Sequence, residues 1–267
     1  PGAALTAAYA INATGHAAGF ATDASDISIG VTWTPAGGGS YGTTLLPFPG
    51  RTDSVATAVN NQGDIAGYTN GTGGLLGAVW LNNGGGTYTP KTVISGEDAI
   101  ITAMNEYGTG AGVYDGDQPL VMVYFEGDFY ALNLSAPFGT THGASNAVNN
   151  FDALAGYVKD PTTATLGEEA ALWLPTETQW DFLNLDQWLD ETDPALGTKW
   201  TLTDALSLSD TWLVAGNGLY DPDGLGPLPA AERAFLLDVS SLVPEPSALA
   251  MALLAAPMLL RRRRSIA

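Results

Sequence analysis

Apolar and polar residues alternate in short runs along most of the chain, and turns rich in Gly, Asn and Thr separate these runs. An alternation with a period of two places successive side chains on opposite faces of a β-strand. The chain has 33 Gly, and only 14% of its residues are charged, which is typical of short strands joined by tight turns. We therefore expect an all-β fold.

One pattern returns five times along the chain. In it an Ala-aliphatic or Ser-Leu pair precedes an anchor residue, and a Gly follows the anchor seven positions later. The anchors are Asn12, Asn60, Asn105, Asn149 and, in a degenerate fifth copy, Ser209, so that the copies start 48, 45, 44 and 60 residues apart. Recurrence in phase over this period is the signature of a repeat protein.

The chemistry of the repeat is that of a turn between two strands. An Asn side chain that folds onto the backbone two residues later starts the turn. The residue three positions after the anchor suits a left-handed backbone; it is Gly15, Gly63 and Gly108, then Asp152 and Trp212 in the last two copies. The second Gly lies in the next strand, where the absence of a side chain permits close backbone approach; it is Gly19, Gly67, Gly112, Gly156 and Gly216.

Two further strands follow the turn in each copy. The third strand carries one bulky aromatic, namely Trp33, Trp80, Tyr124, Trp173 and Phe235, and we expect these rings to pack between repeats. A fourth strand is expected at residues 39–46, 87–94, 127–134 and 179–185. A unit of about 45 residues with four strands has the length and strand number of a propeller blade. Residues 1–242 are therefore expected to form a β-propeller-like domain of about five four-stranded blades.

The last spacing is the longest, and the segment Leu183–Pro194 accounts for it. We interpret this segment as an insertion on one face of the array, either a short helix or an acidic loop. The degenerate fifth copy fits a terminal repeat, because terminal repeats are commonly atypical. Whether a sixth copy lies upstream of Pro1 stays open, and so does the position of the export signal, which we expect upstream of Pro1.

The chain is strongly acidic, with a formal net charge of −19. Without residues 243–267, which hold four of the nine basic residues and one acidic residue, 27 acidic and 5 basic residues leave −22. Such a body repels polyanions, which excludes nucleic acid as a partner. The chain has no Cys, which excludes disulfides, thiolate metal sites and a Cys nucleophile.

The C-terminal residues form a three-part segment. Val243, Pro244, Glu245 and Pro246 come first, an uncharged run from Ala248 to Leu260 follows, and Arg261, Arg262, Arg263 and Arg264 come last. As a hydrophobic helix the 13-residue run covers about 20 Å, less than the roughly 30 Å of bilayer hydrocarbon. The Arg cluster is expected on the cytoplasmic side, which would place residues 1–243 outside the cytoplasm.

This segment resembles the PEP-CTERM sorting signal of bacterial envelope and exopolysaccharide-associated proteins. The resemblance implies that residues 243–267 are membrane-inserted before processing, and that an exosortase-type transpeptidase acts near Pro244, Glu245 and Pro246. The repeats resemble the HAF-type extracellular repeats, built around Ala-Ile-Asn-x-x-Gly-x-x-x-Gly and followed by Ala-x-x-Trp. That resemblance covers about residues 5–240 and says little about activity.

Candidate chemistry is sparse. His16 and His142 are the only His, which is too few for a His-rich metal site, and we expect both to be incidental. Ser40 sits in a Gly-x-Ser-x-Gly match, but a hairpin rather than a strand-to-helix turn surrounds it, so no nucleophile is expected there.

Acidic turns and aromatics give weaker candidates. Asp115 with Asp117, and Asp221 with Asp223, could share a Ca²⁺, but ordinary turns are the favoured interpretation, and no cofactor is expected. Asp186, Asp190, Glu191 and Asp193 are best interpreted as a solvated face, with a Ca²⁺ patch or an acid pair as alternatives. Trp188, Trp200 and Trp212 lie off the repeat register and are the better candidates for stacking on carbohydrate.

The sequence therefore predicts an exported, non-enzymatic surface or exopolysaccharide-matrix protein of a Gram-negative-type bacterium, with a structural or binding role. Its expected partners are the sorting enzyme, the membrane through the tail, and an envelope or matrix polysaccharide. Two alternatives stay open: a glycan hydrolase or lyase on a propeller scaffold, and a calcium-stabilised adhesin. Two carboxyl groups converging in one pocket would favour the enzyme.

Overall fold

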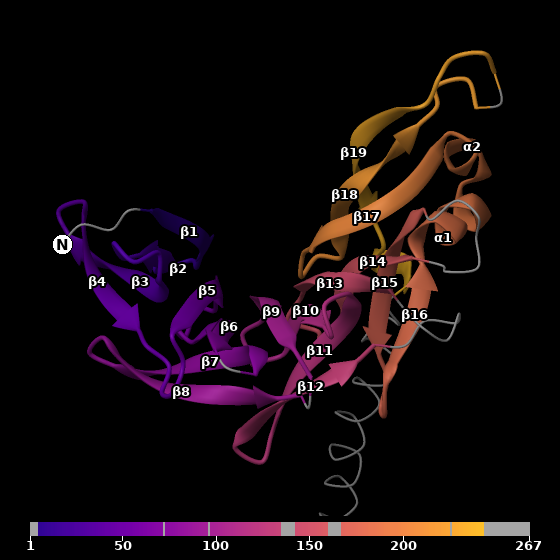
Figure 1. The fold of residues 1–267 in the computed structure, drawn as a ribbon. Helices are drawn as coiled ribbons and strands as arrows, with labels where there is room; N and C mark the ends of the chain where they lie inside the picture. Colours follow the sequence, from indigo (N-terminus) through magenta and orange to yellow (C-terminus); the bar gives the residue numbers. More distant parts are fainter. Residues whose placement is uncertain are drawn as a thin grey trace, which may run out of the picture.

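The computed structural model describes residues 5–71, 73–95, 97–134, 142–159, 167–224 and 226–242. Strands dominate it, which confirms the all-β expectation. The strands form five consecutive antiparallel units, here numbered 1 to 5, that follow one another along an open arc with the first and last units at opposite ends (Figure 1). The predicted C-terminal helix and sorting motif lie outside the described residues.

The first four units each have four strands in up-and-down order. Unit 1 contains β1 (Thr6–Ile11), β2 (Ala17–Thr22), β3 (Ser28–Gly37) and β4 (Ser40–Leu46), and unit 2 contains β5 (Asp53–Val59), β6 (Ile65–Gly71), β7 (Gly74–Gly84) and β8 (Thr87–Ile94). Unit 3 contains β9 (Ala99–Met104), β10 (Gly110–Tyr114), β11 (Gln118–Phe125) and β12 (Asp128–Asn133), and unit 4 contains β13 (His142–Val148), β14 (Leu154–Lys159), β15 (Glu168–Pro175) and β16 (Trp180–Asn184). The four predicted fourth strands are thus confirmed as β4, β8, β12 and β16.

The observed units differ in two ways from the five identical four-stranded units that the sequence predicts. Unit 5 has three strands within the described residues, β17 (Trp200–Leu208), β18 (Leu213–Tyr220) and β19 (Ala231–Asp238). Units 2 and 3 are joined edge to edge, because β8 pairs in parallel with β12 and the two units form one eight-stranded sheet. A short 3₁₀ turn, Ser240–Leu242, ends the described chain.

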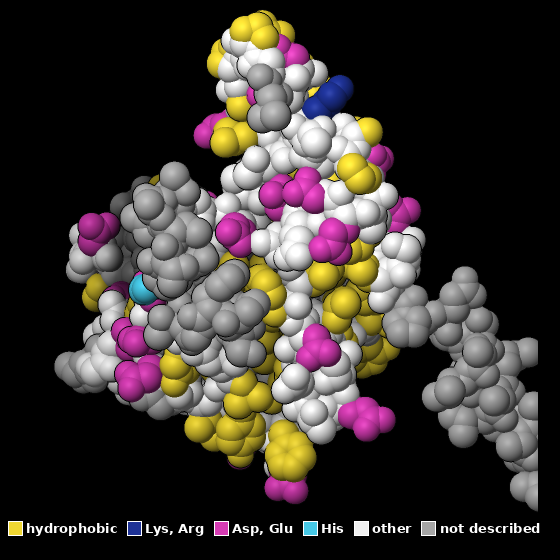
Figure 2. Space-filling view, turned by 90° about the vertical axis from the view of Figure 1, so that its right-hand side faces the viewer, with side chains coloured by type: hydrophobic (Ala, Val, Ile, Leu, Met, Phe, Trp, Pro, Cys, Tyr) yellow, Lys and Arg dark blue, Asp and Glu magenta, His cyan; other side chains and the backbone are white. Residues whose placement is uncertain are grey.

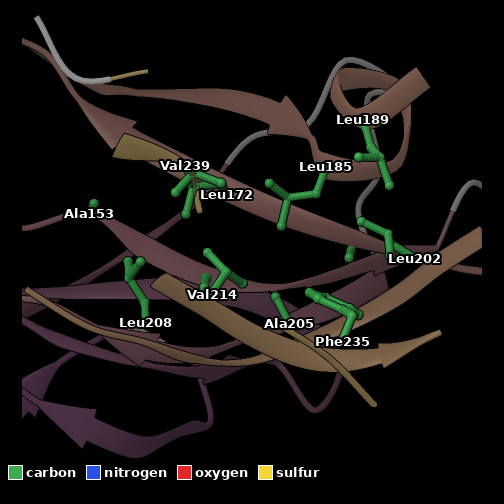
Figure 3. Packing of buried hydrophobic residues seen from close by; sticks show 12 residues of the cluster. Ala153, Leu172, Leu185, Leu189, Leu202, Ala205, Leu208, Val214, Phe235 and Val239 are labelled. Atoms are coloured by element: carbon green, nitrogen blue, oxygen red, sulfur yellow. The ribbon is translucent and has the colours of Figure 1, made fainter. Parts of the chain in front are cut away.

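The insertion before unit 5 is helical, which decides between the two expected forms. It comprises α1 (Leu185–Thr192) and α2 (Pro194–Gly197). Asn184 caps α1 by accepting a hydrogen bond from the Gln187 backbone N–H at 3.0 Å. Leu185 and Leu189 reach from α1 toward the strands that carry Leu172 and Leu202, so the helix closes the core between units 4 and 5 (Figure 3).

The core is divided among the four junctions between units, and one rule describes all four. Each unit has a front row, which packs on the preceding unit, and a back row, which packs on the following one. The front rows are Ile11/Ala17/Trp33, Val59/Ile65/Trp80, Met104/Gly110/Met122, Val148/Leu154/Trp173 and Leu208/Val214/Leu237. The back rows are Ala10/Ala18/Thr32, Ala58/Ala66/Val79, Ala103/Ala111/Val121, Ala147/Ala155/Leu172 and Ser207/Ala215/Leu236.

Size complementarity explains why the rows fit. The small residues of a back row leave room for the larger side chains of the next front row, so that the two surfaces interdigitate. Trp80 and Trp173 are 1% and 0% exposed, as expected for rings that pack between units. Trp33 holds the same register but is only half-buried, because no described residue precedes unit 1 on that side.

Two of the predicted aromatics lie one pleat away from the Trp register, although Phe235 packs into the core between units 4 and 5 as expected. In units 1, 2 and 4 the Trp pairs with the residue five positions after the anchor, as in Ala17↔Trp33. In unit 3 that partner is Met122 rather than Tyr124, and in unit 5 it is Leu237 rather than Phe235. The lengths of the segments between the strands vary among units, so counting residues from the anchor misplaces the ring by one full pleat.

Candidate functional site

The asparagine anchors form the most regular polar feature of the molecule. The Asn105 Oδ1 accepts the backbone N–H groups of Tyr107 and Thr109 at 2.9 and 3.0 Å, which closes the turn after β9. Asn12 and Asn149 close their turns in the same way, through residues two and four positions later. The sequence prediction of a turn started by the Asn side chain is therefore confirmed.

The same amide groups also link the units. The Nδ2 group of each Asn donates to the backbone carbonyl of the next anchor: Asn12 to Asn60 at 2.8 Å, Asn60 to Asn105 at 3.5 Å, Asn105 to Asn149 at 2.9 Å and Asn149 to Ser209 at 3.4 Å. We call this series the asparagine ladder. An amide supplies an acceptor for its own turn on one atom and a donor for the next unit on another, which explains why Asn recurs.

The last anchor shows what the ladder needs. The Ser209 Oγ accepts the Leu213 N–H at 3.0 Å, so it replaces the Asn acceptor within its own turn. A hydroxyl suffices here because no described unit follows unit 5. The departure of the fifth copy from the repeat is thus explained by its place in the array.

A second ladder runs beside the first, and the sequence reasoning missed it. It uses the residue after each anchor: the backbone N–H of one unit donates to the side-chain oxygen of the next. The bonds are Ala13 to Asn61 at 2.9 Å, Asn61 to Glu106 at 2.9 Å, Glu106 to Asn150 at 3.0 Å and Asn150 to Asp210 at 2.8 Å. The only signal in the sequence is that this position holds an acceptor in every copy except the first.

The repeat glycines have the two roles expected of them. Gly15, Gly63 and Gly108 have φ angles of +80° to +87°, and Asp152 and Trp212 adopt φ of +61° and +65° at the same position. A Cβ on the second Gly would lie about 2 Å from a backbone oxygen in all five units; for Gly156 that oxygen belongs to Ala144 at 2.0 Å. At this point the first strand of each unit skips one residue in its pairing, and this β-bulge brings the backbones together.

The predicted acidic turns are ordinary turns in the structure. Asp115 and Gly116 have φ of +47° and +81° and close the hairpin between β10 and β11, while Asp117 contacts His142. The Asp221 Oδ1 accepts the Asp223 N–H at 3.2 Å, which is an Asx turn. Among the described residues, no three His, Asp or Glu side chains are grouped so that they could hold a metal ion.

The remaining candidates, His16, Ser40 and Trp212, each make contacts within the fold. Burial lowers the pKa of His16, which contacts Thr32 and lies 3.2 Å from the Tyr88 hydroxyl across the junction of units 1 and 2. Ser40 donates to the Gly37 carbonyl at 2.7 Å in an exposed hairpin, which leads into β4 rather than into a helix. Trp212 stacks on Phe151 at a centroid distance of 5.6 Å.

The other two aromatic candidates also pack internally. Trp188 and Trp200 lie against the core between units 4 and 5, and Trp200 contacts Tyr220 and Phe235. In the acidic insertion, Asp186 accepts the Leu202 N–H at 2.7 Å and so ties α1 to β17. Burial raises the pKa of Asp186, so this residue is not part of a solvated face.

The structure brings three carboxylates together at a place that the sequence did not indicate. A cleft of about 590 Å³ lies over units 4 and 5, lined by Glu168, Thr203, Asp204, Asn217, Glu232 and Arg233 among others. Burial raises the pKa of Asp204, and the nearby Glu168 charge raises it further, while a hydrogen bond from Asn146 opposes the shift. We call this the acidic cleft.

Both central carboxylates of the acidic cleft already have partners. The Asn146 Nδ2 donates to Asp204 Oδ1 at 2.8 Å, and Lys159 Nζ pairs with Glu168 Oε1 at 3.0 Å. On the face in Figure 2, acidic side chains are dispersed among uncharged ones rather than gathered into one patch. In the acidic cleft a pocket thus coincides with a carboxylate, Asp204, whose pKa is raised.

No known protein family matches the chain, and no curated protein is detectably similar to it in sequence. In the part of the chain that the structure describes, no helix is long and apolar enough to cross a membrane.

Proposed function

We propose that the protein is an exported repeat protein of a bacterial surface or exopolysaccharide matrix, with a structural or binding role and no chemistry of its own. The observation that carries this proposal is the use of the repeated polar residues. The Asn anchors and the acceptors that follow them form hydrogen bonds between neighbouring units. The repeated polar residues therefore support a scaffold rather than an active site.

We infer further that the units are blades of a propeller-type array. Four antiparallel strands in chain order, with each unit stacked on the one before, support this assignment. The array is open in Figure 1, and the ladders give no bond between its ends. The scaffold role does not depend on closure, because the four junctions are complete in the open form.

The C-terminal segment gives the proposed address. Val243 to Pro246 would be read by an exosortase-type enzyme after Arg261 to Arg264 halt export, and the support is their order along the chain. Measuring the intact mass of the protein from the envelope and the medium of its native host tests this. A C-terminus near Val243 is expected, whereas a C-terminus at Ala267 would remove the sorting proposal and leave an anchored protein.

The acidic cleft is the proposed binding site for a matrix polysaccharide. Carboxylate, amide and hydroxyl groups, as in Asp204, Asn217 and Thr203, are suited to bonding with sugar hydroxyls. The charge of −19 selects against polyanionic chains and in favour of neutral or cationic ones. Binding of the native matrix polysaccharide should be lost in Asn217→Ala and retained in Asn83→Ala, where Asn83 is an exposed residue near the end of β7.

A glycan hydrolase or lyase is the second candidate, and the cleft is the observation that favours it. Asp204 has a raised pKa beside Glu168, the kind of pair that divides acid and base roles between two carboxyls. Incubating the wild-type chain with the polysaccharide and measuring new reducing or unsaturated ends separates the two functions. Cleavage that disappears in both Asp204→Asn and Glu168→Gln would establish the enzyme.

The third function, a calcium-stabilised adhesin, gains no support from the structure and is tested directly by its response to Ca²⁺. Its predicted pairs at Asp115 and Asp221 are ordinary turns in the structure, so the geometry adds no support. A melting temperature that rises with added Ca²⁺ and falls with chelator would establish it, whereas equal melting temperatures would remove it.

A further inference from the structure

Within the described residues, the two ends of the array expose the two halves of the interface that joins its units. At one end, the front row of unit 1 is open: Ile11 is 67% exposed, while its counterpart Val59 in unit 2 is 9% exposed. At the other end, the back row of unit 5 is open: Leu236 is 69% exposed, while its counterpart Val79 in unit 2 is 0% exposed. Each end thus carries a surface for which the molecule contains the complementary partner.

Apolar neighbours enlarge both open surfaces. Tyr41 and Leu45 on β4 are 52% and 56% exposed, and an apolar hollow of about 310 Å³ lies between Trp33 and Tyr41. Leu206, beside the back row of unit 5, is 49% exposed. Terminal repeats that face only water normally have polar outer faces, because an exposed apolar face lowers solubility. Among the described residues, neither end has such a cap.

The polar links are missing at both ends. Ser209 has no amide to extend the asparagine ladder, and Ala13 has no acceptor for the second ladder. Leu206 occupies the bulge position, where Thr57, Thr102 and Asn146 donate to a backbone oxygen of the next unit. A contact between the ends would therefore be mainly apolar, with the Ser207 hydroxyl as the polar group of the two facing rows. Such a contact is weaker than an internal junction and separates without breaking hydrogen bonds.

We propose that the open front row of unit 1 binds the open back row of unit 5 in a second copy of this chain, so that copies join head to tail. The argument is continuity with an established interface, because the same front-to-back packing recurs at all four internal junctions. A head-to-tail contact is heterologous and generates filaments, or rings where the rotation closes. This assembly is independent of the sorting proposal and of the acidic cleft.

Sedimentation velocity of the full chain over a range of concentrations tests the proposal. The average mass should rise with concentration, and should rise further with added salt, because salt screens the repulsion between acidic copies while leaving apolar contacts intact. Ile11→Asp blocks the front end and Leu236→Asp blocks the back end. Tyr107→Asp is the matched control, since Tyr107 is 71% exposed in a turn of unit 3.

Mixing the two blocked variants decides the geometry. Each variant alone should stay monomeric, whereas an equal mixture should form a two-copy species and nothing larger, because one open front and one open back remain. The control should assemble like the wild-type chain. Association through the apolar run 248–260 would be the same in every variant, and unchanged melting temperatures would show that the variants fold.

Three results would overturn the proposal. The first is a wild-type chain that stays monomeric up to about 1 mM, a concentration at which even a contact of −4 kcal/mol is detected. The second is association that neither Asp substitution affects. The third is a Leu236→Asp variant that dimerises by itself, which would mean that two front rows pack symmetrically.

Discussion

The junction between units 3 and 4 and the junction between units 4 and 5 use the same parts in different proportions. In the first, Asn105 Nδ2 donates to the Asn149 carbonyl at 2.9 Å and to Asp152 Oδ1 at 2.8 Å. In the second, the corresponding bond from Asn149 to Ser209 is 3.4 Å long, and α1 adds Leu185 and Leu189 to the core. The asparagine ladder and apolar burial are therefore separate contributions, and the ladder bond is longer at the junction where the helix adds apolar burial.

The largest expected effect concerns the feature that both junctions share. In Gly156→Ala the new Cβ would lie 2.0 Å from the Ala144 carbonyl oxygen, and in Gly216→Ala it would lie 2.0 Å from that of Asp204. Both oxygens belong to the backbone, so the strands must separate. We expect each substitution to lower the free energy of unfolding by at least about 4 kcal/mol, measured by urea titration.

Gly42→Ala is the matched control for the glycine substitutions. Its nearest neighbour would be the Thr34 carbonyl oxygen at 3.9 Å, an ordinary contact on a strand. A loss below about 0.5 kcal/mol is expected there. Comparable losses at all three positions would mean that the close approach at the bulge is not what makes Gly necessary.

The next effect separates the two junctions. Asn105→Asp keeps the Oδ1 acceptor for Tyr107 and Thr109 but removes the Nδ2 donor and places a carboxylate beside Asp152. We expect a loss of about 3 kcal/mol, because a buried donor is replaced by a charged oxygen that faces two acceptors, the Asn149 carbonyl and the Asp152 carboxylate. Asn149→Asp should cost less, about 1 to 2 kcal/mol, since its outgoing bond is already long. If urea titrations gave equal losses of unfolding free energy for the two variants, the ladder bond would contribute equally at both junctions, contrary to this expectation.

A smaller effect concerns the helix that unit 5 alone possesses. Leu189 is 5% exposed and packs into the core between units 4 and 5. Leu189→Ala should lower the free energy of unfolding by about 2 kcal/mol, at the low end for a buried Leu because the helix is peripheral and can settle into the space. Leu196→Ala on α2, where Leu196 is 47% exposed, is the control and should change stability by less than about 0.5 kcal/mol.

Local backbone chemistry explains which parts of the fold the sequence predicts. The turn at Asn105 and the left-handed position at Gly108 depend only on residues within four positions, so one copy of the repeat suffices to predict them. The strand order follows from the turns. Even the strained φ of +65° at Trp212 is visible in advance, as the residue that replaces Gly in the last copy.

Features that depend on contacts between units could not be predicted from the sequence. The second ladder uses side chains as different as Asn61, Glu106 and Asp210, which share only an acceptor oxygen. The acidic cleft draws Glu168 from unit 4 and Glu232 from unit 5, and their meeting depends on how two sheets stack. One signal was available: Asp204 is the only charged residue five positions before an anchor, where the other copies have Ala7, Val55, Ile100 and Ala144.

That charge gives the junction of units 4 and 5 a pH dependence of its own. Burial and the Glu168 charge raise the pKa of Asp204, so the folded protein binds this proton more tightly than the unfolded chain does. The contribution to stability is therefore present at low pH and is lost as pH rises from the unfolded value, about 3.9, through the folded one. Asp204→Asn keeps the oxygen that accepts from Asn146 and removes the charge. We expect this variant to be more stable than the wild type at pH 7, with the difference shrinking toward pH 4 in urea titrations. Asp26→Asn, at an exposed turn, makes the same change in net charge and should leave the dependence of the unfolding free energy on pH unaltered. If the Asp204 and Asp26 variants change this dependence equally, its cause is the net charge of the chain rather than the burial of Asp204.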